Sequence, residues 1–296
     1  MDLTNLGVGI ASGIGLGSVY ALIATSFTLI IASTGYFVFA LESVVSLGGI
    51  IASVLTVDQH VPLLAAVFIV CVCGAVLGIG LELVCHRPFV TRLQNAGPAV
   101  LLSSVGVAIA LDAASAEIFG NNPRQIAPFL SPQPIFIGSV PVDRTYIVLA
   151  VTAGILAAIL EIVFRSTTFG RNLRATQGDA EGVALLGLNV KAVITGVFAI
   201  SGLIAGLSGL LIAPIAFASP SVGTSLVLPA FAAIAIGGFG SFRGGIIGGL
   251  LVGLLNGVLP LYISPSAVDL LLFVVIVATL LVRPSGLFAT STSREL

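Results

Sequence analysis

Carboxylates that lie inside long apolar stretches are the residues of this chain with the clearest chemical potential. Glu42 falls in an apolar run at about 36–56, and Asp112 lies deep in another at about 97–119. An ionisable group at membrane depth is costly, so it usually faces a cavity or a partner group. Glu42 therefore predicts one of two roles: a lining residue of a translocation path, or a paired carboxylate that ties two helices together.

A second set of polar residues lies between Ser166 and Lys191. Thr168 is a suitable N-cap for a short helix that ends at Gly178. Arg171 and Arg174 are three residues apart, so they share one face of that helix. The segment therefore carries its own helix signals and a basic face.

Another short helix is predicted directly after the first. Asp179 can cap its start, Glu181 lies near the positive end of its dipole, and Gly187 can end it. Val183 and Leu186 give this helix an apolar side that a loop in water does not need. The pattern predicts either an amphipathic loop that rests on lipid headgroups or a docking element for a cytoplasmic partner.

A glycine-rich break from Gly237 to Gly245 is a further candidate for function inside the membrane. Such a break frees backbone groups, and irregular backbone at membrane depth is tolerated where it lines a cavity. Arg243 lies within the break. It is either a residue at the cytoplasmic mouth of a path or an ordinary positively charged anchor.

The sequence carries none of the common hydrolase motifs: it has neither G-x-S-x-G nor H-E-x-x-H. Cys71, Cys73 and Cys85 lie in or at the end of one apolar run, without metal-site spacing. The single lysine, Lys191, does not stand in a G-x-x-x-x-G-K-[ST] context. We therefore expect no catalytic residues, no metal, no cofactor and no nucleotide site in this chain.

Composition places the chain in the membrane. It has 296 residues, of which 57% are hydrophobic and only 8% are charged, whereas a soluble domain has about 25% charged residues. The net charge of −1 gives no case for binding nucleic acid. We expect one transmembrane domain over residues 1–296, in contact with membrane lipid.

Nine apolar runs predict an all-α polytopic membrane protein with eight to ten transmembrane helical segments. They fall at about 7–32, 36–56, 61–85, 97–119, 145–164, 192–214, 225–240, 244–262 and 266–282. The seventh and eighth runs are short and glycine-rich. They form either two thin spans or a broken, partly re-entrant pair.

Lysine and arginine residues predict the orientation. If the C-terminus is cytoplasmic and nine spans alternate, nine of the eleven basic residues lie inside. These are Arg87, Arg92, Arg165, Arg171, Arg174, Lys191, Arg243, Arg283 and Arg294. The N-terminus is then outside, the segment 166–190 is cytoplasmic, and the proline-rich segment 120–144 is the longest external loop.

Glycines recur every four residues in two of the runs. Gly9, Gly13 and Gly17 lie in the first, and Gly245, Gly249, Gly253 and Gly257 lie in the eighth. Stripes of small residues let helix backbones approach closely in lipid. They predict tight packing within the chain, with a subunit interface as the alternative for one stripe.

The order of residues in the polar segment resembles the cytoplasmic coupling loop of ABC-importer permeases of the branched-chain amino-acid (LivH-type) family. The residues that carry this resemblance are Gly170-Arg171, Arg174-Ala175, Asp179 and Leu186-Gly-Leu-Asn189. The similarity extends to Gly15–Leu22, Phe198–Leu211, Gly237–Ser241 and Gly244–Gly249. It therefore covers most of the chain in collinear order.

The resemblance implies a set of partners. In that family the loop fits a groove on the ATP-hydrolysing subunit, so two ATP-binding subunits in the cytoplasm would supply the power and bind the ATP. The path would lie between two permease subunits, usually different ones, here with a LivM-like partner. An external binding protein would deliver the solute at a bacterial cytoplasmic (inner) membrane.

The helix signals, the membrane-depth polar residues and the resemblance together give the expected site residues. Those expected in ATPase coupling are Gly170, Arg171, Arg174, Ala175, Asp179, Glu181, Ala184, Gly187 and Asn189. Those expected in the translocation path are Phe39, Glu42, Ser43, Phe239 and Ser241.

One departure from the family bears on the solute. Members usually have Asn-Phe-Ala-His/Gln-Gly-Glu where this chain has Val38-Phe-Ala-Leu-Glu-Ser43. The acidic residue has moved by one position, which rotates it by about 100° on a helix. A path with fewer polar groups suits branched-chain or other hydrophobic amino acids, or related small carboxylates. An ion-coupled secondary transporter is the alternative, since a buried carboxylate and broken helices also fit that class.

Overall fold

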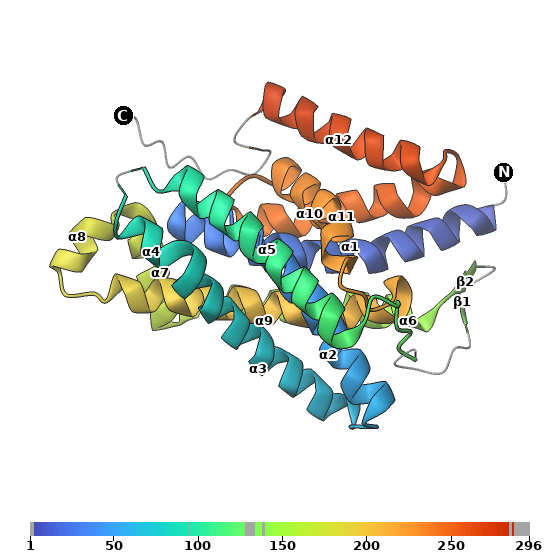
Figure 1. The fold of residues 1–296 in the computed structure, drawn as a ribbon. Helices are drawn as coiled ribbons and strands as arrows, with labels where there is room; N and C mark the ends of the chain where they lie inside the picture. Colours follow the sequence, from blue (N-terminus) through green and yellow to red (C-terminus); the bar gives the residue numbers. More distant parts are fainter. Residues whose placement is uncertain (1–2, 94, 128–133, 138–139, 284–285, 287–296) are drawn as a thin grey trace.

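The computed structural model describes residues 3–93, 95–127, 134–137, 140–283 and 286, and Figure 1 shows their arrangement. In chain order the helices are α1 (Leu3–Thr34), α2 (Leu41–Ser53), α3 (Leu63–Leu81), α4 (Arg87–Val90), α5 (Gly97–Phe119), α6 (Arg144–Ser166), α7 (Thr168–Gly178), α8 (Ala180–Leu185), α9 (Val190–Ala216), α10 (Val222–Gly237), α11 (Phe242–Val258) and α12 (Pro265–Val282). π-Helical turns at Val54–Asp58 and Glu82–His86 extend α2 and α3, and a 3₁₀ turn at Leu259–Leu261 extends α11.

Eight helical segments of the described chain are long and apolar enough to cross a membrane. They contain α1, α2, α3, α5, α6, α9, α11 and α12, while α10 is a shorter apolar helix of 16 residues. The all-α polytopic prediction is therefore confirmed, and the protein is a multi-pass membrane protein. Arg294 and Asp2 lie outside the described residues.

The bundle is built around two helices. Most residues of α1 and α9 are buried, whereas most residues of α3, α5, α6 and α12 are not. Helices α12 and α3 lie at opposite edges of the view in Figure 1. Side chains that are fully buried include Phe27 on α1 and Phe198 on α9. Because the peripheral helices are apolar on their exposed faces too, the fold suits a solvent of hydrocarbon.

The two glycine stripes meet each other. A Cβ atom added at Gly13 would lie 2.9 Å from the carbonyl oxygen of Gly253, and one added at Gly17 would lie 3.0 Å from that of Gly249. The backbones of α1 and α11 are thus in direct contact, as small-residue stripes permit. Tight packing within the chain was the correct reading for these stripes.

Helix α9 packs against α2 and α3 through glycines in the same way. A Cβ atom at Gly74 of α3 would lie 2.5 Å from the carbonyl oxygen of Gly202, and one at Gly49 of α2 would lie 3.1 Å from that of Gly209. Glycines on α9 therefore bring both α2 and α3 against it.

Helix α10 returns the chain to the side on which it entered α9. The start of α11 lies beside the end of α6, where an arginine of α11 contacts Glu161 at 3.0 Å. The end of α11 lies beside the start of α1, where Gly257 meets Gly9. Helix α11 therefore runs from the end of α6 to the start of α1 and is long enough to cross a membrane, whereas α10 is shorter than the membrane-length helices.

The segment 120–144 contains a short hairpin among its described residues. Strands β1 (Ile135–Ile137) and β2 (Val140–Val142) pair antiparallel, with Ile135 opposite Val142. Nearby, Arg124 forms an ion pair with Asp58 at 2.6 Å and an isolated bridge with Ala218. Residues 128–133, which include two of the prolines expected to order this loop, lie outside the described residues.

We predict that Gly253→Ala will destabilise the protein. The added methyl group would clash with the backbone of Gly17, and overpacking of this kind costs about 1–3 kcal/mol. The midpoint of thermal aggregation in detergent should fall. Gly106→Ala on α5, where a Cβ meets open space, is the matched control. Equal midpoints for the two variants would contradict the backbone contact.

Candidate translocation groove and docking segment

A groove of about 340 Å³ lies between α2 and α10. It is lined by Phe39, Glu42, Thr224, Val227, Leu228 and Phe231. One wall is the start of α2 and the residues just before it, and the other is one face of α10. The lining is apolar except for the carboxylate of Glu42 and the hydroxyl of Thr224.

A close backbone contact fixes the two walls of the groove. The Gly223 amide donates a hydrogen bond of 2.8 Å to Ser46 Oγ. A Cβ atom on Gly223 would clash with the carbonyl oxygen of Glu42. Glycine at this position lets the first turn of α10 rest on α2, so Thr224 is brought beside Glu42.

A chain of aromatic rings leads away from the groove. Phe39 packs against Phe37 at 4.7 Å between ring centroids, and Phe37 stacks on Phe27 at 4.8 Å. Phe231 contacts Phe37 at 5.6 Å and Phe239 at 5.9 Å. The rings of α1, α10 and the segments beside them therefore form one continuous apolar surface.

The five residues predicted for the path do not all meet in this groove. Phe39 and Glu42 line it, and Phe239 lies one ring away through its contact with Phe231. Ser43 points to α5 instead, where its hydroxyl donates to the Ala108 carbonyl at 3.2 Å. Ser241 caps α11 by accepting from the Gly244 amide at 3.1 Å.

Sequence reasoning missed the wall that α10 contributes. The predicted apolar run began at 225, so it excluded Thr224, and Phe231 lay in a stretch with no polar marker. Thr224 and Phe231 are seven residues apart and share a helix face. That spacing was the available signal, but it did not identify α2 as the partner.

One carboxylate of the groove and one carboxylate of α5 each have a buried oxygen atom. Glu42 Oε2 and Asp112 Oδ1 are buried and have no hydrogen-bond partner within the part of the chain that the structure describes. A buried charge without a partner is costly, whereas a carboxylate that receives a cationic group is stabilised. Glu42 lines the groove, so it is available to a positively charged group that enters there.

The polar segment forms two short helices, as its sequence predicted, with one correction. Thr167, not Thr168, caps α7: its hydroxyl accepts from the Gly170 amide at 3.3 Å. The Thr167 backbone is extended, with φ −91° and ψ 161°, and Thr168 is already helical. Helix α7 ends at Gly178 as expected.

Helix α8 has the predicted cap and the predicted end. Asp179 Oδ1 accepts from the Gly182 amide at 2.9 Å, and Gly187 has a left-handed φ of 88°. Leu185 and Leu186 at its tip are 89% and 87% exposed. Asn189 caps α9 by accepting from the Ala192 amide at 3.1 Å. The side chains of Ala180 and Glu181 lie outside the described part of the structure.

Helix α7 is attached to the bundle, in contrast to α8. The Arg174 guanidinium donates to the Phe164 carbonyl at the end of α6, and Gly170 lies against the same residue. Phe169 fills the space beside Gly196 of α9. Arg171, Ala184 and Leu185 are exposed, and no hydrogen bond of their side chains to the bundle is seen in the described part of the chain. The segment therefore has an anchored base and a protruding apolar tip.

Ion pairs and hydroxyl groups hold the bundle together near this segment. Glu82 is 3% exposed and pairs with Arg87 at 2.9 Å, while Thr195 of α9 accepts from Arg87 at 3.1 Å. Glu161 of α6 pairs with Arg165 at 2.6 Å and with Arg243 at 3.0 Å. Arg243 is thus a link between α6 and α11, and it does not contact the groove.

Within the described ranges no three His, Cys, Asp or Glu residues gather as metal ligands. The three cysteines are unpaired, and Cys85 is buried. The expectation that this chain binds no cofactor remains a prediction.

The eight membrane-length helices define a multi-pass membrane protein, and sequence comparison identifies its family. Residues 9–280 match the family described as "Branched-chain amino acid transport system / permease component". The chain therefore belongs to this permease family.

Its relatives agree with that assignment. The high-affinity branched-chain amino acid transport system permease protein LivH of Salmonella typhimurium is 30% identical over 93% of each chain. The corresponding protein BraD of Pseudomonas aeruginosa is 27% identical over 94% of each chain. The xylose transport system permease protein XylH of Haemophilus influenzae is 36% identical over 31% of this chain and 24% of its own.

We predict that Gly187→Val will loosen the α8–α9 turn. A β-branched residue at a positive φ costs about 1–3 kcal/mol, so the turn should open more often. Trypsin should then cleave after Lys191 faster than in the parent. Gly178→Val is the matched control, because an added Cβ meets open space there and no positive φ is required. Equal cleavage rates in the two variants would show that the left-handed stop is dispensable.

Proposed function

We propose that this chain is the membrane-spanning permease subunit of an ABC importer and forms half of the translocation path. The match to the permease family over residues 9–280 carries this proposal, and the capped, protruding α8 supports it. The residues 1–296 act as one permease domain, with 166–190 as the coupling segment and 120–144 as the external loop.

The proposed partners follow from this assignment. Two ATP-binding subunits in the cytoplasm bind the ATP and dock on α7 and α8, and a second, LivM-like permease completes the path. A solute-binding protein delivers the solute from outside. Leu185 and Leu186 give the docking segment an apolar contact, and Arg171 gives it a cation that can pair with a carboxylate on the ATPase.

The proposed orientation places the α7–α8 side in the cytoplasm of a bacterium, at the inner membrane. Nine of eleven basic residues then lie inside. The contact of Gly257 with Gly9 supports opposite sides for the two ends of the bundle, because α11 ends beside the start of α1 and the membrane-length α12 then runs away from it. The N-terminus is outside and the C-terminus cytoplasmic.

We predict that Ala184→Pro in α8 will uncouple ATP hydrolysis from uptake or release the ATPase, because α8 is proposed to transmit movement between the two subunits. Proline inside α8 removes a backbone donor and clashes with the preceding turn, at about 3 kcal/mol or more. No membrane-spanning helix is changed, so insertion should be normal. The measurements are ATPase retention in a pull-down and solute uptake in proteoliposomes.

Ala180→Pro is the matched control for that experiment. Ala180 is the first residue of α8, where proline is tolerated, and Asp179 before it is extended, with φ −150° and ψ 94°. This variant should keep its ATPase and its uptake. If Ala184→Pro also transports at the parent rate, the segment is only a surface connector.

The groove supports a small hydrophobic amino acid as the solute class. Glu42 can pair with an α-ammonium group, while Phe39 and Phe231 offer apolar contacts to a side chain. A sugar would leave Glu42 without a cation. The proposal therefore favours branched-chain or related amino acids.

We predict that Glu42→Gln will lower leucine uptake about tenfold in the reconstituted importer. A hydrogen bond to a charged group contributes about 1.5–3 kcal/mol, which corresponds to tenfold or more. Glu117→Gln on the exposed side of α5 is the matched control and should transport at the parent rate.

The same preparation tests the solute class directly. A binding protein loaded with leucine should stimulate ATP hydrolysis, whereas one loaded with xylose should not. Stimulation by the xylose-loaded protein alone would refute the amino-acid assignment while leaving the importer assignment intact.

A further inference from the structure

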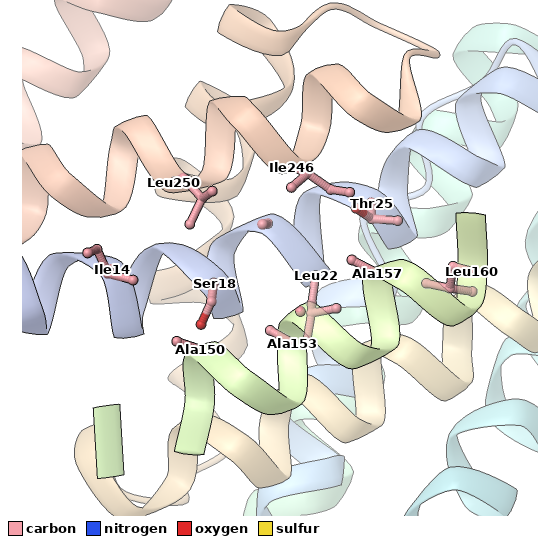
Figure 2. Close-up of a pocket in the computed structure, with 12 residues that line it drawn as sticks. Ile14, Ser18, Leu22, Thr25, Ala150, Ala153, Ala157, Leu160, Ile246 and Leu250 are labelled. Carbon is pink, nitrogen blue, oxygen red and sulfur yellow. The ribbon is translucent and has the colours of Figure 1, made fainter. Parts of the chain in front are cut away.

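An apolar groove separate from the proposed path runs between α6 and α11, with α1 as its floor. Figure 2 shows the small residues Ala150, Ala153 and Ala157 of α6 along one wall and Ile246 and Leu250 of α11 along the other. The groove has a volume of about 150 Å³.

The groove is lined almost entirely by apolar side chains, with Ser18 and Thr25 as its two hydroxyl residues. Ser18 lies on its floor, but its hydroxyl donates to the Gly15 carbonyl of its own helix at 2.6 Å. Helix α6 exposes most of its length and packs mainly on α1. The groove therefore opens sideways from the bundle at membrane depth, where its surroundings are hydrocarbon chains.

A basic cleft of about 310 Å³ adjoins one end of the groove. It lies among α1, α6, α7 and α11, and its lining includes Arg165, Arg174 and Arg243. Glu161 is the carboxylate in this lining, 2.6 Å from Arg165 Nε and 3.0 Å from Arg243. Three cations and one anion leave two positive charges, and the side chains of Arg165 and Arg243 are 60% and 64% exposed.

The groove and the cleft follow one another along the same three helices. Leu160 lines the groove and Glu161 the cleft on α6, and Thr25 and Thr28 do so on α1. On α11 the groove ends at Ile246 and the cleft includes Arg243. The apolar groove, here called the trough, is therefore followed within one helical turn by the basic cleft, which forms a positively charged mouth at the membrane surface.

We propose that this amphipathic crevice binds one anionic phospholipid from the leaflet on the α7 side. An acyl chain lies in the trough between α6 and α11, and the phosphate pairs with Arg165 and its neighbours. Basic pockets between membrane helices recognise anionic headgroups, and arginine forms bidentate contacts with phosphate. A soluble phosphate would use only the mouth, whereas a lipid uses both parts.

The bound lipid would add a contact between α6 and α11, which already meet through the Glu161–Arg243 pair and the Phe164–Phe242 rings. It would bridge α6 to α11 beside the Glu161–Arg243 pair and contact the base of α7. The site does not overlap the groove at Glu42, so the inference is independent of the solute.

The test uses the full chain in the assembly in which it purifies, freed of lipid in detergent. Native mass spectrometry measures binding of phosphatidylglycerol and of phosphatidylcholine. Phosphatidylglycerol should bind more tightly, and Arg165→Gln should weaken it about fivefold, as one lost basic residue near a headgroup predicts. Arg283→Gln, an exposed arginine at the end of α12, should leave binding unchanged.

A second variant tests the trough without changing charge. Gly154 lines the groove, and a Cβ there meets open space, so Gly154→Leu should fill it and weaken binding about tenfold or more. Gly106→Leu on α5 is the matched control, because a Cβ there also meets open space. This arm tests the proposal even if Arg165→Gln does not remain monodisperse.

Three results would overturn the proposal. Equal affinity for phosphatidylcholine would show that the arginines play no part. Displacement of phosphatidylglycerol by millimolar inorganic phosphate would indicate a site for a free anion. Unchanged binding in Gly154→Leu would show that no acyl chain occupies the trough.

Discussion

The structure depends on backbone contacts that only glycine permits. In a membrane the interior of the bundle is no more apolar than the lipid around it, so burial alone does not drive helices together. Close approach compensates, because it increases dispersion contacts between backbones. Helix α1 meets α11 along Gly13, Gly17 and Gly253, and α9 meets α3 through Gly74 and Gly202.

Both candidate sites follow from these contacts. The α1–α11 contact leaves α6 as a separate layer on α1, and the lipid-facing crevice lies between α6 and α11. The contact of Gly223 with α2 sets Thr224 beside Glu42 and forms the candidate path. The docking segment is different, since it is stabilised by local caps and protrudes from the bundle.

The parts of this protein that could be predicted from sequence are the local ones. Asp179 and Gly187 act within a few residues of their own positions, so the N-cap and the end of α8 could both be predicted from the sequence. Two adjacent threonines left the start of α7 ambiguous, and the extended backbone at Thr167 decided it. Hydrophobic run length likewise gave the spans, because the thickness of the bilayer is fixed.

The groove could not be predicted, because its two walls are about 180 residues apart in the sequence. Nothing in the sequence around Phe39 and Glu42 identifies Thr224 or Phe231 as neighbours. Ser43 lies outside the groove, because one step along α2 from Glu42 turns a side chain by about 100°, toward α5. The glycine stripes were recognisable, but the sequence did not pair them.

The contact between Gly223 and Glu42 has a consequence for how solute size can be set. Because the walls meet backbone to backbone, the spacing between α2 and α10 is already at its minimum there. The width of the proposed path is therefore governed by the rings of Phe39 and Phe231 and not by helix separation. A change of solute size within this architecture would require trimming an aromatic ring or moving α10 as a rigid unit.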